Sequence, residues 1–251
     1  MNKSQTIDFA DVLKGRRATY QLLARFYRVE VDEDFLALLR GMDYPTATGN
    51  EDVDAGYALI RDFLSRGSET VLQDLAKDYV YAFIGSGNDG FSAAYPYESV
   101  YTSPRRLMMQ DARDEVLVIY RAAGLEKTES WKEGEDHIAL ELEYEQILCE
   151  RALEAYEAGK TEECLSFLCH QRNFLQDHLC GWFPMMAEDI EKFAHTDFYR
   201  GVGRLTTGFL NNDLAFLDEL LADNDVDDAS VAARADAIRA TDAARAAETT
   251  R

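Results

Sequence analysis

The chain has few positive charges and few residues that break helices. Its 251 residues include 26 Lys and Arg against 47 Asp and Glu, a formal net charge of -21. This negative excess repels nucleic-acid phosphates and anionic lipid surfaces, so neither is an expected partner, and cationic partners are favoured. Only 4 prolines occur. Apolar residues recur mostly at helical spacing, as in Leu13, Tyr20, Leu23, Ala24 and Tyr27, so the pattern predicts helices almost throughout.

Cysteine and long apolar runs are scarce as well. The 4 cysteines have no C-x-x-C spacing, so we expect reduced, buried thiols rather than disulfides, with a zinc site as the less favoured alternative. No run reaches the roughly 18 apolar residues of a membrane span, and the first residues have no apolar stretch of signal-peptide length. We therefore expect a cytoplasmic protein without stable membrane insertion.

The length and the 47% hydrophobic content suffice for one sizeable core. We predict an all-α fold, a single compact multi-helix domain of about ten helices over residues 1–221. Residues 222–251 are rich in alanine, partly acidic and free of aromatic residues, so they are expected to form an appendage that docks weakly or is disordered. Helices are expected over about 53–65, 69–83, from Pro104 to Gly124, and over about 136–158, 161–179, 184–194 and 196–210, with a short one ending near Leu221.

Signatures of catalysis are weak. Residues 85–90 satisfy G-x-G-x-x-G after a run that resembles a strand, but Pro96 interrupts the segment behind them, and no second βαβ unit is present. A flexible loop is the favoured interpretation. No serine lies in G-x-S-x-G and no H-E-x-x-H occurs. We therefore expect no enzymatic activity and no cofactor.

One predicted helix carries a possible metal site. His137, Glu141 and Glu145 lie on one helical face at four-residue steps, a geometry that can hold a metal ion. Helical diiron sites use Glu-x-x-His instead, and no histidine here has a glutamate three residues before it. We predict a solvated acidic face in which His137 pairs with a neighbouring carboxylate, and no metal.

Two short segments carry a more specific pattern. They are Tyr97-Glu98-Ser99-Val100-Tyr101 and Glu133-Gly134-Glu135-Asp136-His137. With matches at Tyr79–Gly85, Phe174–Leu179 and Thr196–Tyr199, they resemble the twin-arginine leader-binding chaperones, the redox enzyme maturation family, in the expected order over most of residues 16–210. In that family an E-P-x-D-H segment lies beside an aromatic-lined groove that receives a signal peptide. Gly134 stands here where proline is usual, a change that bears on the rigidity of the loop more than on the charged pair.

The resemblance implies a helical, non-enzymatic chaperone. Its partners would be the twin-arginine signal peptide and the apo form of a molybdenum oxidoreductase of the dimethyl sulfoxide reductase type, held until cofactor insertion and export. Asp136 would offer a carboxylate to a leader arginine, and His137 a hydrogen bond to the peptide backbone. The alternative is that Asp136 only caps the following helix. The apolar floor of the groove would consist of Phe83, Pro96, Tyr97 and Tyr101, each of which could equally be core.

Two other functions stay open from the sequence alone. One is a nucleotide-binding hydrolase that uses the 85–90 glycine loop with Asp136, and the other is a helical scaffold that binds the mature client without its leader. The sequence does not identify the client. It also leaves the oligomeric state open, and a homodimer is one outcome, because helical folds of this kind can exchange elements between protomers.

Overall fold

A computed structural model of the chain describes residues 8–85 and 91–226. Within these residues there is no strand, and the one β-type pairing is an isolated antiparallel bridge between Tyr97 and His137. The prediction of an all-α fold is confirmed. Residues 86–90 of the glycine loop, and 227–251 of the predicted appendage, lie outside the described part.

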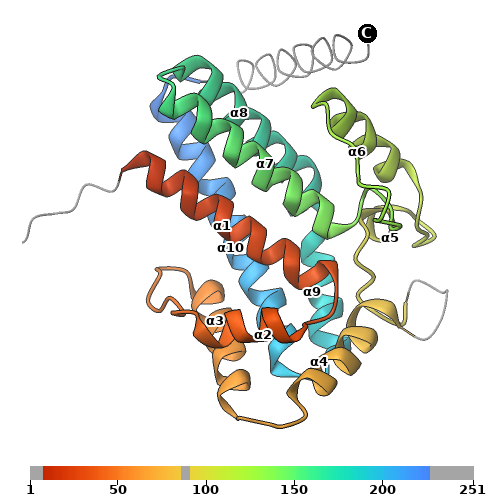
Figure 1. The fold of residues 1–251 in the computed structure, drawn as a ribbon. Helices are drawn as coiled ribbons and strands as arrows, with labels where there is room; N and C mark the ends of the chain where they lie inside the picture. The colour runs from red at the N-terminus through yellow and green to blue at the C-terminus, as the bar shows by residue number, and fades with distance from the viewer. Residues whose placement is uncertain (1–7, 86–90, 227–251) are drawn as a thin grey trace, which may run out of the picture.

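Helices make up most of the described part of the chain (Figure 1). Two of them continue into π-helical turns, η1 (Val80–Ile84) and η2 (Leu175–Leu179). No helix of the described residues is both long and apolar enough to cross a membrane. The helices are α1 (Phe9–Arg28), α2 (Glu33–Gly41), α3 (Glu51–Ser65), α4 (Val71–Tyr79), α5 (Glu98–Thr102), α6 (Asp111–Ala122), α7 (Ile138–Glu157), α8 (Thr161–Phe174), α9 (Cys180–Phe193) and α10 (Asp197–Asp223).

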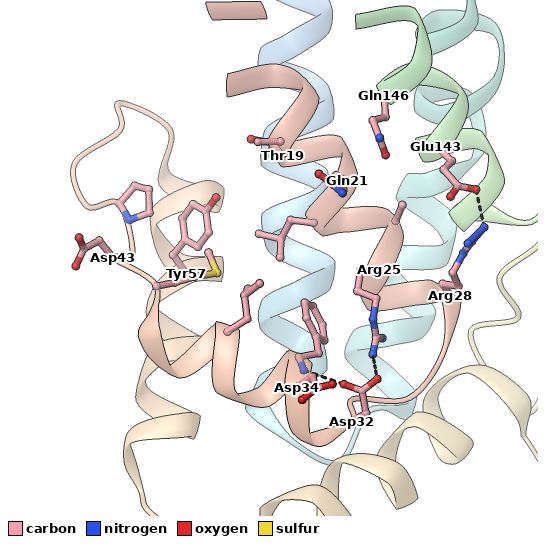
Figure 2. Close-up of a pocket in the computed structure, with 17 residues that line it drawn as sticks. Thr19, Gln21, Arg25, Arg28, Asp32, Asp34, Asp43, Tyr57, Glu143 and Gln146 are labelled. Carbon is pink, nitrogen blue, oxygen red and sulfur yellow. Dashed lines mark hydrogen bonds and ion pairs between the residues drawn. The ribbon is translucent and has the colours of Figure 1, made fainter. Parts of the chain in front are cut away.

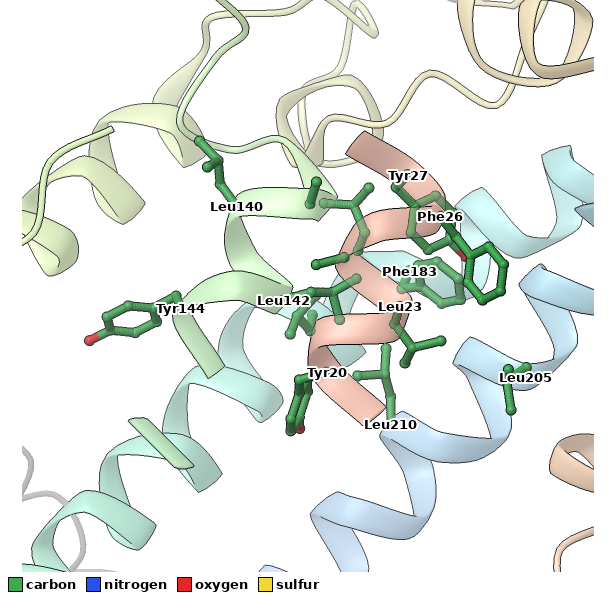
Figure 3. Close-up of a cluster of buried hydrophobic side chains, with 14 of the residues drawn as sticks. Tyr20, Leu23, Phe26, Tyr27, Leu140, Leu142, Tyr144, Phe183, Leu205 and Leu210 are labelled. Atoms are coloured by element: carbon green, nitrogen blue, oxygen red, sulfur yellow. The ribbon is translucent and has the colours of Figure 1, made fainter. Parts of the chain in front are cut away.

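The core forms where α1, α7, α9 and α10 pack together. In Figure 3 Tyr20 and Leu23 of α1 point into a cluster with Leu142 of α7, Phe183 of α9 and Leu205 of α10, all fully or almost fully buried. The stripe predicted for α1 is buried as expected, because helical spacing places its members on the face that points into the bundle core. The four cysteines are free thiols, three of them buried.

Several helix boundaries differ from the predictions. The helix expected from residue 184 begins at Cys180, directly after η2. The helix expected from Pro104 begins only at Asp111, because Ser103 ends α5 and the backbone of Arg106 and Met109 is left-handed, with φ of 49° and 58°. At the other end of the chain, one helix of 27 residues replaces the two expected. Its buried stripe continues past the expected break, through Asp213, Leu217 and Leu221.

Candidate functional site

The two sequence segments that carry the family pattern meet in space. The N–H of Glu98 donates to the carbonyl oxygen of Asp136 over 3.0 Å, and the N–H of Ile138 donates to that of Pro96 over 2.9 Å. These bonds join the segment before α5 to the segment before α7. We call this contact, over residues 96–99 and 134–138, the junction.

Asp136 holds the junction together rather than capping α7. It is 1% exposed, and its Oδ2 accepts a hydrogen bond from the N–H of Ser99 in the first turn of α5, over 2.9 Å. Its Oδ1 has no hydrogen-bond partner among the described residues. Burial raises the pKa of this carboxyl, because the charged form is desolvated. The prediction that Asp136 caps α7 is thus wrong. Asp136 instead joins α5 to the segment before α7.

His137 is the N-cap of α7. Its Nδ1 accepts a hydrogen bond from the N–H of Ala139 over 3.1 Å, and the rings of Tyr97 and Trp131 stand edge-on to the imidazole. The side chain is 3% exposed, and burial, with the nearby charge of Arg28 as the smaller cause, lowers the pKa of His137 to about 3. The imidazole is therefore neutral at pH 7, which Nδ1 needs in order to accept. The expected pairing of His137 with a carboxylate is wrong.

The predicted solvated face of α7 is also wrong. Glu141 and Glu145 are 0% exposed, because this face of α7 lies inside the helix bundle. Trp182 donates its Nε1–H to Oε2 of Glu141 over 2.9 Å. Desolvation raises the pKa of both glutamates well above its usual range. Within the described part of the chain, no group of three His, Cys, Asp or Glu side chains is arranged to hold a metal ion.

The aromatic residues predicted for the peptide site are buried too. Phe83 is in edge contact with Tyr79 and Tyr199. Tyr101 stacks on Trp182 and donates its hydroxyl to Oδ2 of Asp189 over 3.2 Å. The structure brings Pro96, Tyr97, Asp136 and His137 together at the junction, with Tyr101 one turn along α5. In this arrangement none of the predicted residues presents an open surface, and their role in peptide binding stays a prediction.

The structure gives a physical reason for glycine at position 134. A Cβ atom there would lie 2.7 Å from Oδ1 of Asp136, closer than such contacts allow. A proline at this position would require the Asp136 carboxylate to shift. Gly134 is therefore compatible with the buried position of Asp136, so the exchange of the family's proline for glycine affects the carboxylate as well as the loop.

An open groove lies elsewhere, between α1, α2, α3 and α7, with a volume of about 800 Å³ (Figure 2). Its apolar lining includes Leu22, Phe35, Leu38 and Met42, and its carboxylates are Asp32, Asp34, Asp43 and Glu143. Arg25 pairs with Asp32 over 2.7 Å, and Arg28 with Glu143 over 2.6 Å. Sequence reasoning missed this groove because its walls come from four separated helices, and no local spacing signals it.

Arg28 connects the groove to the junction. Its guanidinium carbon lies 4.9 Å from the centroid of the Trp131 ring, and Trp131 packs against His137. The same guanidinium binds Glu143 in the groove. Arg28 therefore lines the groove and links it to the junction through Trp131.

Comparison with known proteins finds one matching family and relatives that share one name. A family model described as nitrate reductase delta subunit matches residues 48–188, more than half of the chain. Chaperone protein TorD of Vibrio cholerae is 31% identical over 147 residues, 59% of this chain and 64% of the relative. TorD of Vibrio parahaemolyticus is 29% identical over 57% of this chain and 64% of the relative. TorD of Shewanella pealeana is 23% identical over 87% of this chain and 96% of the relative. The chain thus matches a little under two thirds of the length of the Vibrio relatives.

Proposed function

The chain belongs to the nitrate reductase delta subunit family, and we propose that it is a cytoplasmic, non-enzymatic chaperone for the maturation of a molybdenum-containing oxidoreductase. The observation that carries this proposal is the family match over residues 48–188, which contains both segments of the junction. The relatives named Chaperone protein TorD support it.

At finer detail, we propose that the ligand is the twin-arginine leader of a client of the dimethyl sulfoxide reductase type, held until the cofactor is inserted. A net charge of -21 favours a cationic peptide over an anionic one. The groove beside α2 adds carboxylates next to exposed apolar side chains. A peptide with arginines beside an apolar stretch matches both properties.

Access to the predicted peptide-binding residues requires a change at the junction. The polar groups of Asp136 and His137 are occupied by backbone N–H groups of the chain itself. We propose that these two residues, with Phe83, Pro96, Tyr97 and Tyr101, contact the leader after residues 96–99 separate from 134–138. Strand-like pairing with a peptide would then replace the bridge between Tyr97 and His137.

Calorimetry with a synthetic leader tests the proposed function. We expect a Kd of about a micromolar or tighter, and weaker binding at higher salt, because screening reduces the attraction of arginines to carboxylates. The control is the same peptide with both arginines replaced by glutamine. Equal affinity for the two peptides would refute charge recognition. A leaderless client that binds as tightly as the complete one would favour the scaffold alternative.

The nucleotide hydrolase alternative has a separate test. Most of its loop, residues 86–90, lies outside the described part of the chain, so the structure adds nothing in its favour. A nucleotide that binds the native state raises the melting temperature by mass action. We expect millimolar ATP or GTP to leave the melting temperature unchanged, and a clear rise with hydrolysis above background would promote this alternative.

A further inference from the structure

The groove beside α2 has two carboxylates that no cation of the described residues neutralises. Its two arginines are already paired, Arg25 with Asp32 and Arg28 with Glu143. Asp34 and Asp43 also line the groove, and within the described residues neither forms an ion pair. The groove therefore keeps two uncompensated negative charges, and these are exposed to solvent.

Apolar side chains lie between these carboxylates. Leu38, in the middle of α2, is 54% exposed, so its side chain is available to an apolar partner. Met42 follows the helix and is half-buried, and its flexible thioether adapts to ligands of different shape. An exposed apolar strip between negative charges is the complement of a peptide that carries apolar side chains next to cationic ones.

The spacing of the two carboxylates suits neighbouring cations on an extended peptide. Figure 2 shows Asp34 near the start of α2 and Asp43 beyond its end. The nine residues of α2 rise about 13 Å. Successive side chains of an extended chain point to opposite sides, so two consecutive arginines extend apart and can each approach one carboxylate.

We propose that this groove binds the arginine pair of the twin-arginine leader, with Asp34 and Asp43 as the two anionic contacts and Leu38 and Met42 under the adjacent apolar residues. The inference rests on the proposed function, because the leader is its occupant. It assigns the arginines to exposed carboxylates that need no rearrangement, whereas Asp136 is buried at the junction and reaches no ligand in this arrangement.

The test compares two double variants that lose the same charge. Asp34→Asn with Asp43→Asn removes the groove carboxylates, and Glu115→Gln with Glu219→Gln removes two exposed carboxylates from α6 and α10, outside the groove. Binding of a fluorescent synthetic leader is measured by anisotropy at low and physiological salt. We expect Kd to rise about tenfold or more in the groove variant, the change that about 1.4 kcal/mol of lost binding produces. In the control, Kd should rise by no more than about twofold, because only long-range attraction changes.

Two further measurements separate the arginine contacts from folding and from the apolar contacts. Melting curves of both double variants check that the substituted residues, which are exposed, leave the fold intact. Leu38→Gln should raise the Kd of the complete leader. It should raise by the same factor the Kd of the peptide whose arginines are replaced by glutamine. An unchanged Kd for the complete leader in Leu38→Gln would overturn the assignment of the apolar contact.

The outcomes distinguish this inference from the proposed function. If the wild-type chain binds the leader and the groove variant binds it as tightly as the control variant does, the groove assignment is overturned and the proposed function stands. If the wild-type chain does not bind the leader at all, both are overturned. A groove variant that retains leader affinity but loses self-association, measured by sedimentation, would show a subunit interface and would also overturn the assignment.

Discussion

His137 provides a quantitative test of the junction, because its geometry fixes its protonation state. The N-cap bond needs an unprotonated Nδ1, and burial lowers the pKa of His137 to about 3. In the unfolded chain the pKa is about 6.5. Between these values the unfolded chain binds one more proton than the folded chain, so stability falls as the pH falls through this window.

The variant His137→Asn isolates this proton. Asparagine is as good an N-cap as any residue and does not titrate, so the cap is kept while the pH dependence is removed. From pH 7 to pH 5, the free energy of unfolding of the wild type should fall by about 2 kcal/mol more than that of the variant. Any packing lost with the imidazole is the same at both pH values and cancels in this comparison.

Urea unfolding of both proteins, at half-unit steps from pH 7.5 to pH 5 in one buffer series, gives these free energies. The wild type and the variant should differ by a constant above pH 7 and converge or cross as the pH falls. Parallel curves over the whole range would mean that His137 takes up its proton in the folded state as readily as in the unfolded state. The buried cap at the junction would then be refuted.

Three other outcomes are expected. Gly56→Ala should destabilise by roughly 1–3 kcal/mol, because its Cβ would lie 2.5 Å from the backbone nitrogen of Leu205 in α10, whereas Gly15→Ala, with open space around it, should stabilise by about 1 kcal/mol in thermal unfolding. Desolvation raises the pKa of Glu145 well above its usual range, while the unfolded chain ionises near about 4.3, so stability falls as the pH rises above that value. Because Glu145→Gln does not titrate, its stability relative to the wild type should increase from pH 4 to pH 7, and equal pH profiles of the two proteins would contradict this. Leader binding should speed amide hydrogen exchange at Glu98 and Ile138 if the junction opens, and slower exchange there would refute opening.

The sequence alone predicted correctly those features that depend on the spacing of nearby residues. The stripe of α1 is buried as predicted, and Gly159, with its left-handed φ of 71°, ends α7 within a residue or two of the predicted position. Both the apolar spacing and the glycine that ends a helix depend only on residues of the same helix and its immediate end. The family pattern likewise predicted that Tyr97 and His137 belong to one site, and the structure places them in contact.

Prediction failed where burial depends on partners far away in the sequence. Glu141 and Glu145 look like a solvated face, yet Trp182 reaches Glu141 from α9, and Arg16 from α1 is the largest charge effect on the pKa of Glu145. Ser103 with Pro104 has the composition of a helix start, but the helix before it ends there. No local spacing reports which helices will pack against a given face.

The position of the junction lets residues of the family pattern influence the groove without lining it. His137 fixes where α7 begins, and Glu143 and Gln146 follow within the first three turns of that helix, where they form one wall of the groove. A shift at the start of α7 would therefore move Glu143 relative to Arg28 and to α1. Variants at the junction should change leader affinity through the groove as well as through direct contact. Leader affinity for any junction variant has to be compared with that of the Asp34 and Asp43 variants before a contact is assigned.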